Sequence, residues 1–175
     1  GLDVGIIRPT AVVGAGGKNL FKLANSLVYG NPFVNYLKTC VLGTMPMHLV
    51  PVGNVVAALL HLSIQTNNLD GNIFIVSSDY DADNNFQKIQ QIITEELELV
   101  PTRFPNITIP KALQLFIFKI INRNDINMTR TYNSQKIYDT GLKSIDSVRV
   151  AVKQFCSGIE LKRSFKTNSK NKVID

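Results

Sequence analysis

Three groups of residues in this chain could carry chemistry by their type and spacing. The run Gly14-Ala15-Gly16-Gly17-Lys18 is rich in glycine, and glycine-rich turns let backbone amides approach a phosphate. Tyr132 and Lys136 have the spacing Tyr-x-x-x-Lys, in which a lysine can lower the pKa of a tyrosine for general acid and base catalysis. The third group consists of common transition-metal ligands: His48, His61, Cys40 and Cys156.

The histidines and cysteines do not form a metal-binding pattern. Neither His48 nor His61 has a cysteine, aspartate or glutamate at ligand spacing, so we expect no metal site. Cys40 and Cys156 lie far apart in the sequence without a short Cys-x-x-Cys motif. Two such thiols favour a reducing, cytoplasmic location.

The glycine-rich run does not match a phosphate-binding motif. It lacks the spacing G-x-G-x-x-G, and Lys18 is followed by Asn19 where a P-loop has serine or threonine. We interpret it as a tight turn.

Length and composition favour one globular unit. The 175 residues can enclose a core, and 45% hydrophobic with 18% charged residues is ordinary for a globular chain. Much of the net charge of +6 lies near the C-terminus. We therefore divide the chain into a folded part, 1–160, and a solvated basic polar tail, 161–175, and expect no nucleic-acid partner. The longest apolar stretch, 112–121, is too short to cross a bilayer, so we expect no integral membrane segment.

Hydrophobic periodicity predicts strands alternating with helices, followed by mostly helical sequence. The opening run 2–13 reads as an apolar strand of the kind that helices cover on both faces. Such a strand at the first residues leads us to expect a preceding N-terminal half of the same fold. The remaining elements are helix 19–29 with Gly30 as C-cap, a loop 31–45 with a short strand 39–42, strand 48–52, helix 55–64, strand 72–78, a helix capped by Asn84 or Asn85, helix 110–121 and helix 148–161.

Four elements in this order resemble the extended short-chain dehydrogenases, and among them the NAD-dependent epimerase/dehydratase family. They are Ile7-Arg8-Pro9-x-x-x-Val13-Gly14-x-Gly16, Asn19-Leu20, Val50-Pro51-Val52-Gly53-Asn54-Val55-Val56-x-Ala58 and Asn72-x-Phe74-x-Val76-Ser77. The resemblance covers about residues 1–100 and corresponds to the C-terminal half of such enzymes. It implies an α/β fold: the C-terminal part of a Rossmann-type parallel sheet with a small, mainly helical substrate-binding lobe.

The resemblance also implies binding residues. The turn Pro9, Thr10, Ala11 and Val12 would contact the nicotinamide end of NAD or NADP. Asn19 and Leu20 would contact the diphosphate of a nucleotide-sugar substrate, and a helix N-terminus suits phosphate on physical grounds. A role for Asn19 as a simple helix cap is equally open.

The resemblance places the catalytic pair and the cofactor's glycine-rich motif upstream of this chain, so no catalytic residue is assigned here. Tyr132 and Lys136 follow the Arg-Pro strand, whereas the family's catalytic pair precedes it. Two positions depart from the family pattern. Met47 stands where many relatives carry arginine, and Val52-Gly53-Asn54 stands where relatives often carry Val-x-Asp. The asparagine form occurs in steroid-type branches.

Three functions remain open at this point. The first is an NAD(P)-dependent nucleotide-sugar epimerase, dehydratase or reductase, of which this chain is a fragment. A homodimer is a possible assembly of the complete enzyme. The second is a hydroxysteroid-type dehydrogenase, suggested by Gly53-Asn54 and the apolar helix 112–121. The third is a non-catalytic binding module.

Overall fold

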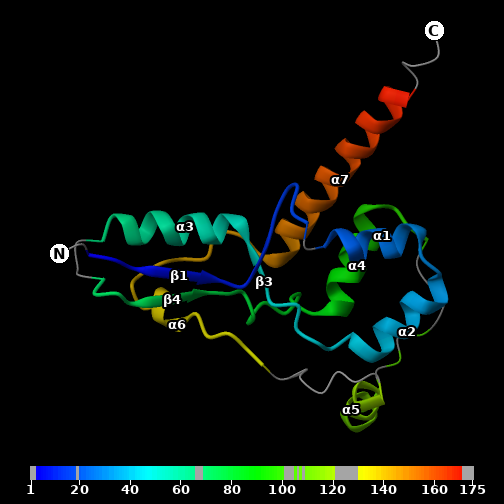
Figure 1. Ribbon diagram of the computed structural model, residues 1–175, viewed down its shortest axis with the longest axis horizontal. Coiled ribbons are helices and arrows are strands. Elements are labelled where there is room, and N and C mark those ends of the chain that lie inside the picture. The colour runs from blue at the N-terminus through cyan, green and yellow to red at the C-terminus, as the bar shows by residue number, and fades with distance from the viewer. Residues whose placement is uncertain are drawn as a thin grey trace.

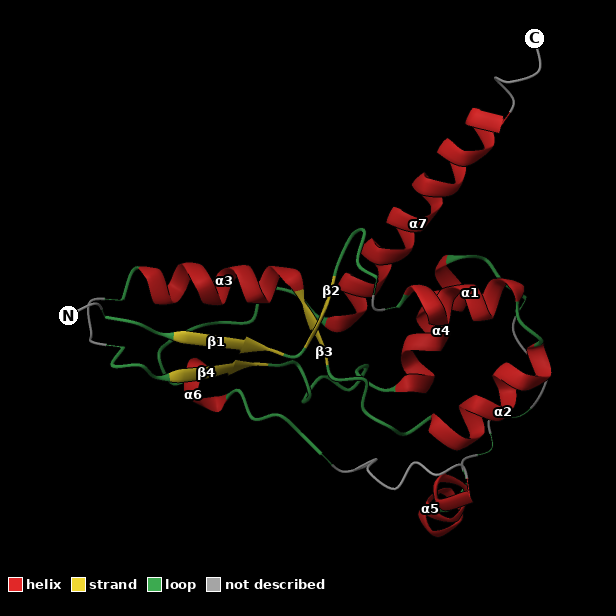
Figure 2. Cartoon of the chain, viewed as in Figure 1, coloured by secondary structure: helices red, strands yellow, loops and turns green. Residues whose placement is uncertain are grey.

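The computed structural model describes residues 3–18, 20–65, 69–100, 105, 107, 109–120 and 130–170, with only the helical backbone for 160–170. The fold is mixed α/β with parallel strands, a partial Rossmann-like fold with a helical lobe, as the sequence predicts. Figure 2 shows the strands at the centre and most of the helices to one side of them.

Two parallel strand pairs form the centre of the fold. Strand β1 (Ile6–Pro9) pairs with β4 (Ile73–Val76) in the register Ile6 to Ile73. Strand β2 (Ala11–Val13) pairs with β3 (Leu49–Pro51) in the register Ala11 to Leu49. The apolar run that the sequence presents as one strand is therefore two strands with different partners.

The change of partner takes place at Thr10. Its N–H donates to the Val76 carbonyl at 3.0 Å, which is the last bond to β4. The next N–H, of Ala11, donates to the His48 carbonyl at 2.9 Å and begins the pairing with β3. The residues on the two sides of Thr10 therefore pair with different strands, in two separate two-stranded sheets.

Helices cover both faces of the β1–β4 pair. Figure 1 shows α3 (Val52–Ser63) along one face and the short α6 (Gln135–Tyr138) on the other. Ala58 and Leu62 of α3 join Phe74 and Ile137 in a buried cluster. This cluster fixes the sheet between the two helices.

The helical lobe packs around a second buried cluster. The lobe consists of α1 (Phe21–Tyr29), α2 (Pro32–Leu42), α4 (Phe86–Glu96) and α7 (Val148–Lys170). Helix α5 (Lys111–Ile120) contributes no described residue to this cluster. Ile89 and Ile93 of α4 pack with Val152 and Phe155 of α7, all of them fully buried. Arg149 of α7 adds an ion pair to Asp83, which raises the pKa of the guanidinium. No helix in the described ranges combines the length and apolarity that crossing a membrane requires.

Most expected elements are confirmed with small shifts of their bounds: helix 55–64 begins earlier as α3, strands 48–52 and 72–78 are shorter, and Gly30 is the C-cap of α1. Asn85 caps α4 by accepting from the Lys88 N–H at 3.0 Å. The glycine-rich run is a tight turn, in which the Gly17 N–H donates to the Gly14 carbonyl at 3.0 Å.

The expectation of a loop at 31–45 with a short strand at 39–42 is wrong, because helix α2 occupies this segment. Asn31 accepts hydrogen bonds from the N–H groups of Phe33 and Val34, and Pro32 occupies the first helical turn. Asparagine followed by proline is a helix-start signal that outweighs the β-branched residues farther along. Helix α7 also continues past the expected end at Leu161, as far as Lys170.

Asn54 holds the loop that precedes α7 against the start of α3. Its Nδ2 donates to Ser144 Oγ at 3.1 Å and to the Asp146 carbonyl at 2.9 Å. Its Oδ1 accepts from the N–H groups of Ile145 and Asp146 at 2.8 and 2.9 Å. Asn54 is 3% exposed, so all four bonds are shielded from water. A Cβ on the neighbouring Gly53 would meet the Asp146 carboxylate, whose side chain would have to move aside.

We predict that Asn54→Asp lowers the free energy of unfolding by about 2–4 kcal/mol. A carboxylate cannot donate, so Ser144 Oγ and the Asp146 carbonyl lose their donor while a charge is buried beside them. Urea unfolding followed by circular dichroism measures the change.

Asn31→Asp is the matched control. Asn31 is exposed and only accepts hydrogen bonds from the α2 N-terminus, a role that aspartate fills equally well. Its stability should stay within about 0.5 kcal/mol of the wild type. Equal stabilities of the two variants would contradict the role assigned to Asn54.

Candidate functional site

A cavity of about 410 Å³ lies at the carboxyl ends of β1 and β4, where the chain changes partner at Thr10. Crevices at the carboxyl ends of parallel strands are the usual ligand sites of open α/β sheets. Its lining residues come from β1, β2, β4, the residue before β3 and the segment before α6: Arg8, Pro9, Thr10, Ala11, His48, Ile75, Arg130 and Tyr132.

His48 and Asp79 form a hydrogen-bonded pair at this cavity. His48 Nδ1 lies 2.8 Å from Asp79 Oδ2, and the Asp79 side chain is completely buried. The same carboxylate oxygen accepts from the Tyr132 N–H at 2.8 Å. Because a carboxylate only accepts, His48 Nδ1 carries the proton of this bond. His48 itself has a left-handed backbone, with φ +51°.

Asn84 brings the two partners together. Its Nδ2 donates to the carbonyls of Leu49 and Ser78, each at 2.9 Å, and its Oδ1 accepts from the Leu49 N–H at 3.0 Å. Leu49 directly follows His48, and Ser78 directly precedes Asp79. Asn84 therefore ties the loop after β4 to the start of β3.

Two arginines give the cavity positive charge. The Arg130 guanidinium lies 5.1 Å from the centre of the Tyr132 ring, and the Tyr132 ring meets the His48 ring edge-on, with 5.0 Å between centres. Arg8 lines the same cavity from β1. Guanidinium groups bind carboxylate and phosphate oxygens, so the cavity suits an anionic ligand.

Two buried polar atoms near this cavity have no hydrogen-bond partner within the described parts of the chain. They are Thr10 Oγ1 and Asp79 Oδ1. Buried polar groups are almost always hydrogen-bonded, and an exception at a cavity commonly marks a place for water or ligand. Thr10 lines the cavity, and a rotation of its side chain toward the cavity would bring this buried hydroxyl to a ligand there.

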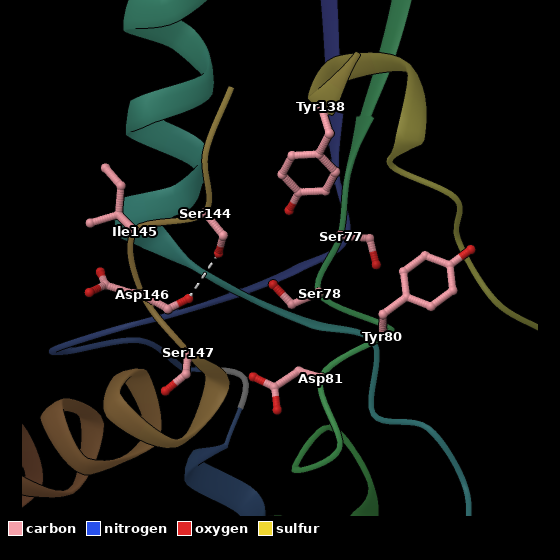
Figure 3. Close-up of a pocket in the computed structure, with 9 residues that line it drawn as sticks. All are labelled: Ser77, Ser78, Tyr80, Asp81, Tyr138, Ser144, Ile145, Asp146 and Ser147. Atoms are coloured by element: carbon pink, nitrogen blue, oxygen red, sulfur yellow. Dashed lines mark hydrogen bonds between the residues drawn. The ribbon is translucent and has the colours of Figure 1, made fainter. Parts of the chain in front are cut away.

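A second cavity, of about 400 Å³, lies between the loop after β4 and the loop before α7 (Figure 3). Asp81 and Asp146 bring two carboxyl groups to its lining, and no arginine or lysine among the described residues lines it. Asp81 Oδ2 accepts from the Val148 N–H at 2.8 Å at the start of α7. Its acidic residues and structural hydrogen bonds make it the weaker candidate for an anionic ligand.

The cavity at Thr10 brings together three of the four residues that the sequence suggests for the cofactor. Pro9, Thr10 and Ala11 line it, whereas Val12 packs beside the buried cluster under α3. Leu20, backbone included, is only 1% exposed and belongs to the core of the helical lobe. Asn19 lies outside the described residues.

Tyr132 and Lys136 do not act as a pair in this structure. Lys136 Nζ donates to Asn72 Oδ1 at 3.0 Å and lies 5.1 Å from the centre of the Phe74 ring. Asn72 precedes β4, whereas Tyr132 lies at the cavity beyond the other end of that strand. No group of three histidine, cysteine, aspartate or glutamate side chains that could hold a metal occurs in the described ranges.

Sequence reasoning missed the pair of His48 and Asp79 and the contribution of Arg130. The pair is separated by 31 residues, and neither residue belongs to a recognisable motif. The one usable signal was the polar Ser77-Ser78-Asp79 that directly follows an apolar strand, because the carboxyl end of a parallel strand is where ligands bind.

No protein-family model matches the chain, and neither does a curated protein sequence. Among solved structures, MoeE5 in complex with UDP-glucose and NAD superposes with a TM-score of 0.54 over 94% of this chain, at 16% identity. The protein gox2253 superposes with a TM-score of 0.50 over 90% of this chain, at 15% identity. The chain spans about half of each, 48% and 49%. The chain therefore has a partial, Rossmann-type α/β fold, which is the fold that the sequence resemblance implies.

Proposed function

We propose that this chain forms the nicotinamide-side and sugar-side wall of an NAD(P)-dependent nucleotide-sugar epimerase, dehydratase or reductase. The observation that carries the proposal is the cavity at the β1–β2 switch, in which Pro9, Thr10 and Ala11 face two arginines. The structural similarity to a protein that holds both UDP-glucose and NAD supports it. The choice between NAD and NADP and the identity of the sugar stay open in this proposal.

The residues of this wall fit the nicotinamide end of a dinucleotide. Pro9 and Ala11 offer apolar contact, and Thr10 Oγ1 is a buried hydroxyl without a partner in the described structure. The carboxamide group of a nicotinamide supplies both a donor and an acceptor for such a hydroxyl. When bound, the cofactor supplies hydride transfer to and from a sugar carbon, while the protein orients the reacting atoms.

Two apolar surfaces that are exposed in the described structure favour the proposal that this wall is part of a larger sheet. Within the described structure β1 pairs on one side only, with β4, and Ile6 is 42% exposed. On α3 an apolar stripe points away from the sheet, with Leu60 62% exposed. Its other members are Val52, Val56, Leu59 and Ile64. In the proposal, an N-terminal half of the same fold covers both surfaces and supplies the glycine-rich cofactor motif and the catalytic tyrosine and lysine.

A hydroxysteroid-type dehydrogenase of the same superfamily is the second candidate. The observation in its favour is α5, on which Leu113, Leu115, Phe116 and Ile120 are exposed. Such a face could approach a lipid or an apolar alcohol. The two arginines of the cavity favour the nucleotide sugar, because a sterol offers no anionic group for them to bind.

We predict that Thr10→Val weakens binding of nicotinamide mononucleotide to this chain about three- to tenfold, the effect of one lost hydrogen bond. The free energy of unfolding should stay the same or rise by about 1 kcal/mol, because valine replaces a buried hydroxyl that has no partner. Binding is measured from amide chemical-shift changes in NMR titrations, and stability from urea unfolding.

Thr39→Val is the matched control. Thr39 Oγ1 lies 2.9 Å from the Asn35 carbonyl and 2.6 Å from Gln90 Oε1 in the helical lobe and shares its one proton between them, so its loss should lower stability by about 1–2 kcal/mol and leave binding unchanged. AMP should produce no shift near Thr10, since the adenylate site lies outside this wall. Tight binding of NAD by this chain alone, or equal binding by the Thr10 variant, would contradict the proposal.

A further inference from the structure

His48 is placed to contact a ligand. It lines the cavity, its side chain is 25% exposed, and its Nδ1 is engaged by Asp79. Within the described part of the chain, its Nε2 has no hydrogen-bond partner. The ring therefore has one nitrogen fixed by the protein and one nitrogen left for whatever enters the cavity.

Burial of the Asp79 carboxylate lowers the stability of the fold unless its contacts compensate for the lost hydration. Its side chain is fully buried, Oδ2 accepts from His48 Nδ1 and the Tyr132 N–H, and Oδ1 has no partner among the described residues. Burial of a carboxylate carries a desolvation penalty that a histidine and one amide offset only in part. A carboxylate on one ring nitrogen fixes the tautomer and the orientation of the imidazole, which a purely apolar packing residue could not do.

The polar groups of the cavity include both hydrogen-bond donors and hydrogen-bond acceptors for a ligand. Arg8 and Arg130 only donate hydrogen bonds, so they suit anionic oxygens such as those of a diphosphate. A hydroxyl-bearing ligand also needs acceptors for its O–H protons. With Nδ1 holding the proton shared with Asp79, His48 Nε2 can accept such a bond, beside the hydroxyls of Thr10 and Tyr132.

We propose that His48 Nε2 binds a hydroxyl of the sugar part of the nucleotide-sugar ligand, and that Asp79 is the positioning residue that fixes its tautomer. This inference rests on the proposed function, whose cavity it uses. It assigns to His48 a role in orienting the sugar against the wall formed by Pro9, Thr10 and Ala11. The diphosphate is left to the two arginines.

The chain contains only two histidines, which makes the tautomer directly measurable. A long-range ¹H–¹⁵N spectrum of the full 175-residue chain at alkaline pH should show His48 protonated at Nδ1. His61 is the internal reference for the titrations: its Nε2 lies 3.1 Å from the Thr140 carbonyl and 2.8 Å from Gln65 Nε2, so it does not share the carboxylate contact of His48. A His48→Gln variant assigns the two sets of signals, and an Nε2-protonated His48 would overturn the positioning role of Asp79.

The ligand contact is tested with UDP-glucose and with UDP as separate titrants. UDP-glucose should shift the His48 Nε2 resonance and leave His61 unchanged, whereas UDP should shift neither. His48→Gln should weaken UDP-glucose binding about three- to tenfold with UDP binding unchanged, and His61→Gln should change neither affinity.

The outcomes separate this inference from the function on which it rests. Amide shifts around Thr10 and Arg130 with UDP-glucose, but none at His48, would overturn the inference and leave the proposed function standing. An equal His48 shift with UDP would place the diphosphate at His48 and also overturn it. Absence of any response to UDP-glucose would overturn both, with the tautomer measurement still deciding the role of Asp79.

Discussion

The exchange of strand partners at Thr10 is the constraint on which the rest of the structure depends. Up to Pro9 the chain follows β4, and from Ala11 it follows β3. The residues on the two sides of Thr10 thus belong to two separate strand pairs, and a cavity lies where one pair gives way to the other. The opening lies at the carboxyl ends of parallel strands, and the candidate site is the space that results.

Buried asparagine side chains position the loops around this opening. Asn84 ties the loop after β4 to β3 with three hydrogen bonds and thereby places Asp79 beside His48. Asn54, at the start of α3, performs a similar task by holding the loop before α7. Both asparagines use donor and acceptor together, which explains why aspartate would not substitute at either place.

Much of the fold follows from the sequence, because its signals there are local. The apolar runs of β3 and β4 and the spacing of Ile89, Ile92 and Ile93 on α4 reflect the periods of strand and helix. Helix α2 is the exception: Thr39 and the apolar residues after it favour a strand, but Asn31 followed by Pro32 starts a helix that continues through them.

The site was predictable only in part, because its residues come from distant segments. The Arg-Pro turn was visible as a motif, and Pro9, Thr10 and Ala11 do line the cavity. Nothing local shows that Leu20 points into the core, since its burial depends on α4 and α7 packing over it. The pair of His48 and Asp79 depends on a left-handed residue and on the clamp made by Asn84, neither of which leaves a local pattern.

A crystal structure of this chain with nicotinamide mononucleotide and UDP-glucose would test the central claim most directly. The account predicts electron density for the nicotinamide ring against Thr10 and Ala11, with the sugar beside His48 and the diphosphate near Arg8 and Arg130. Ligand density in the cavity between Ser77 and Ser147 instead, with the space at Thr10 filled only by water, would contradict it.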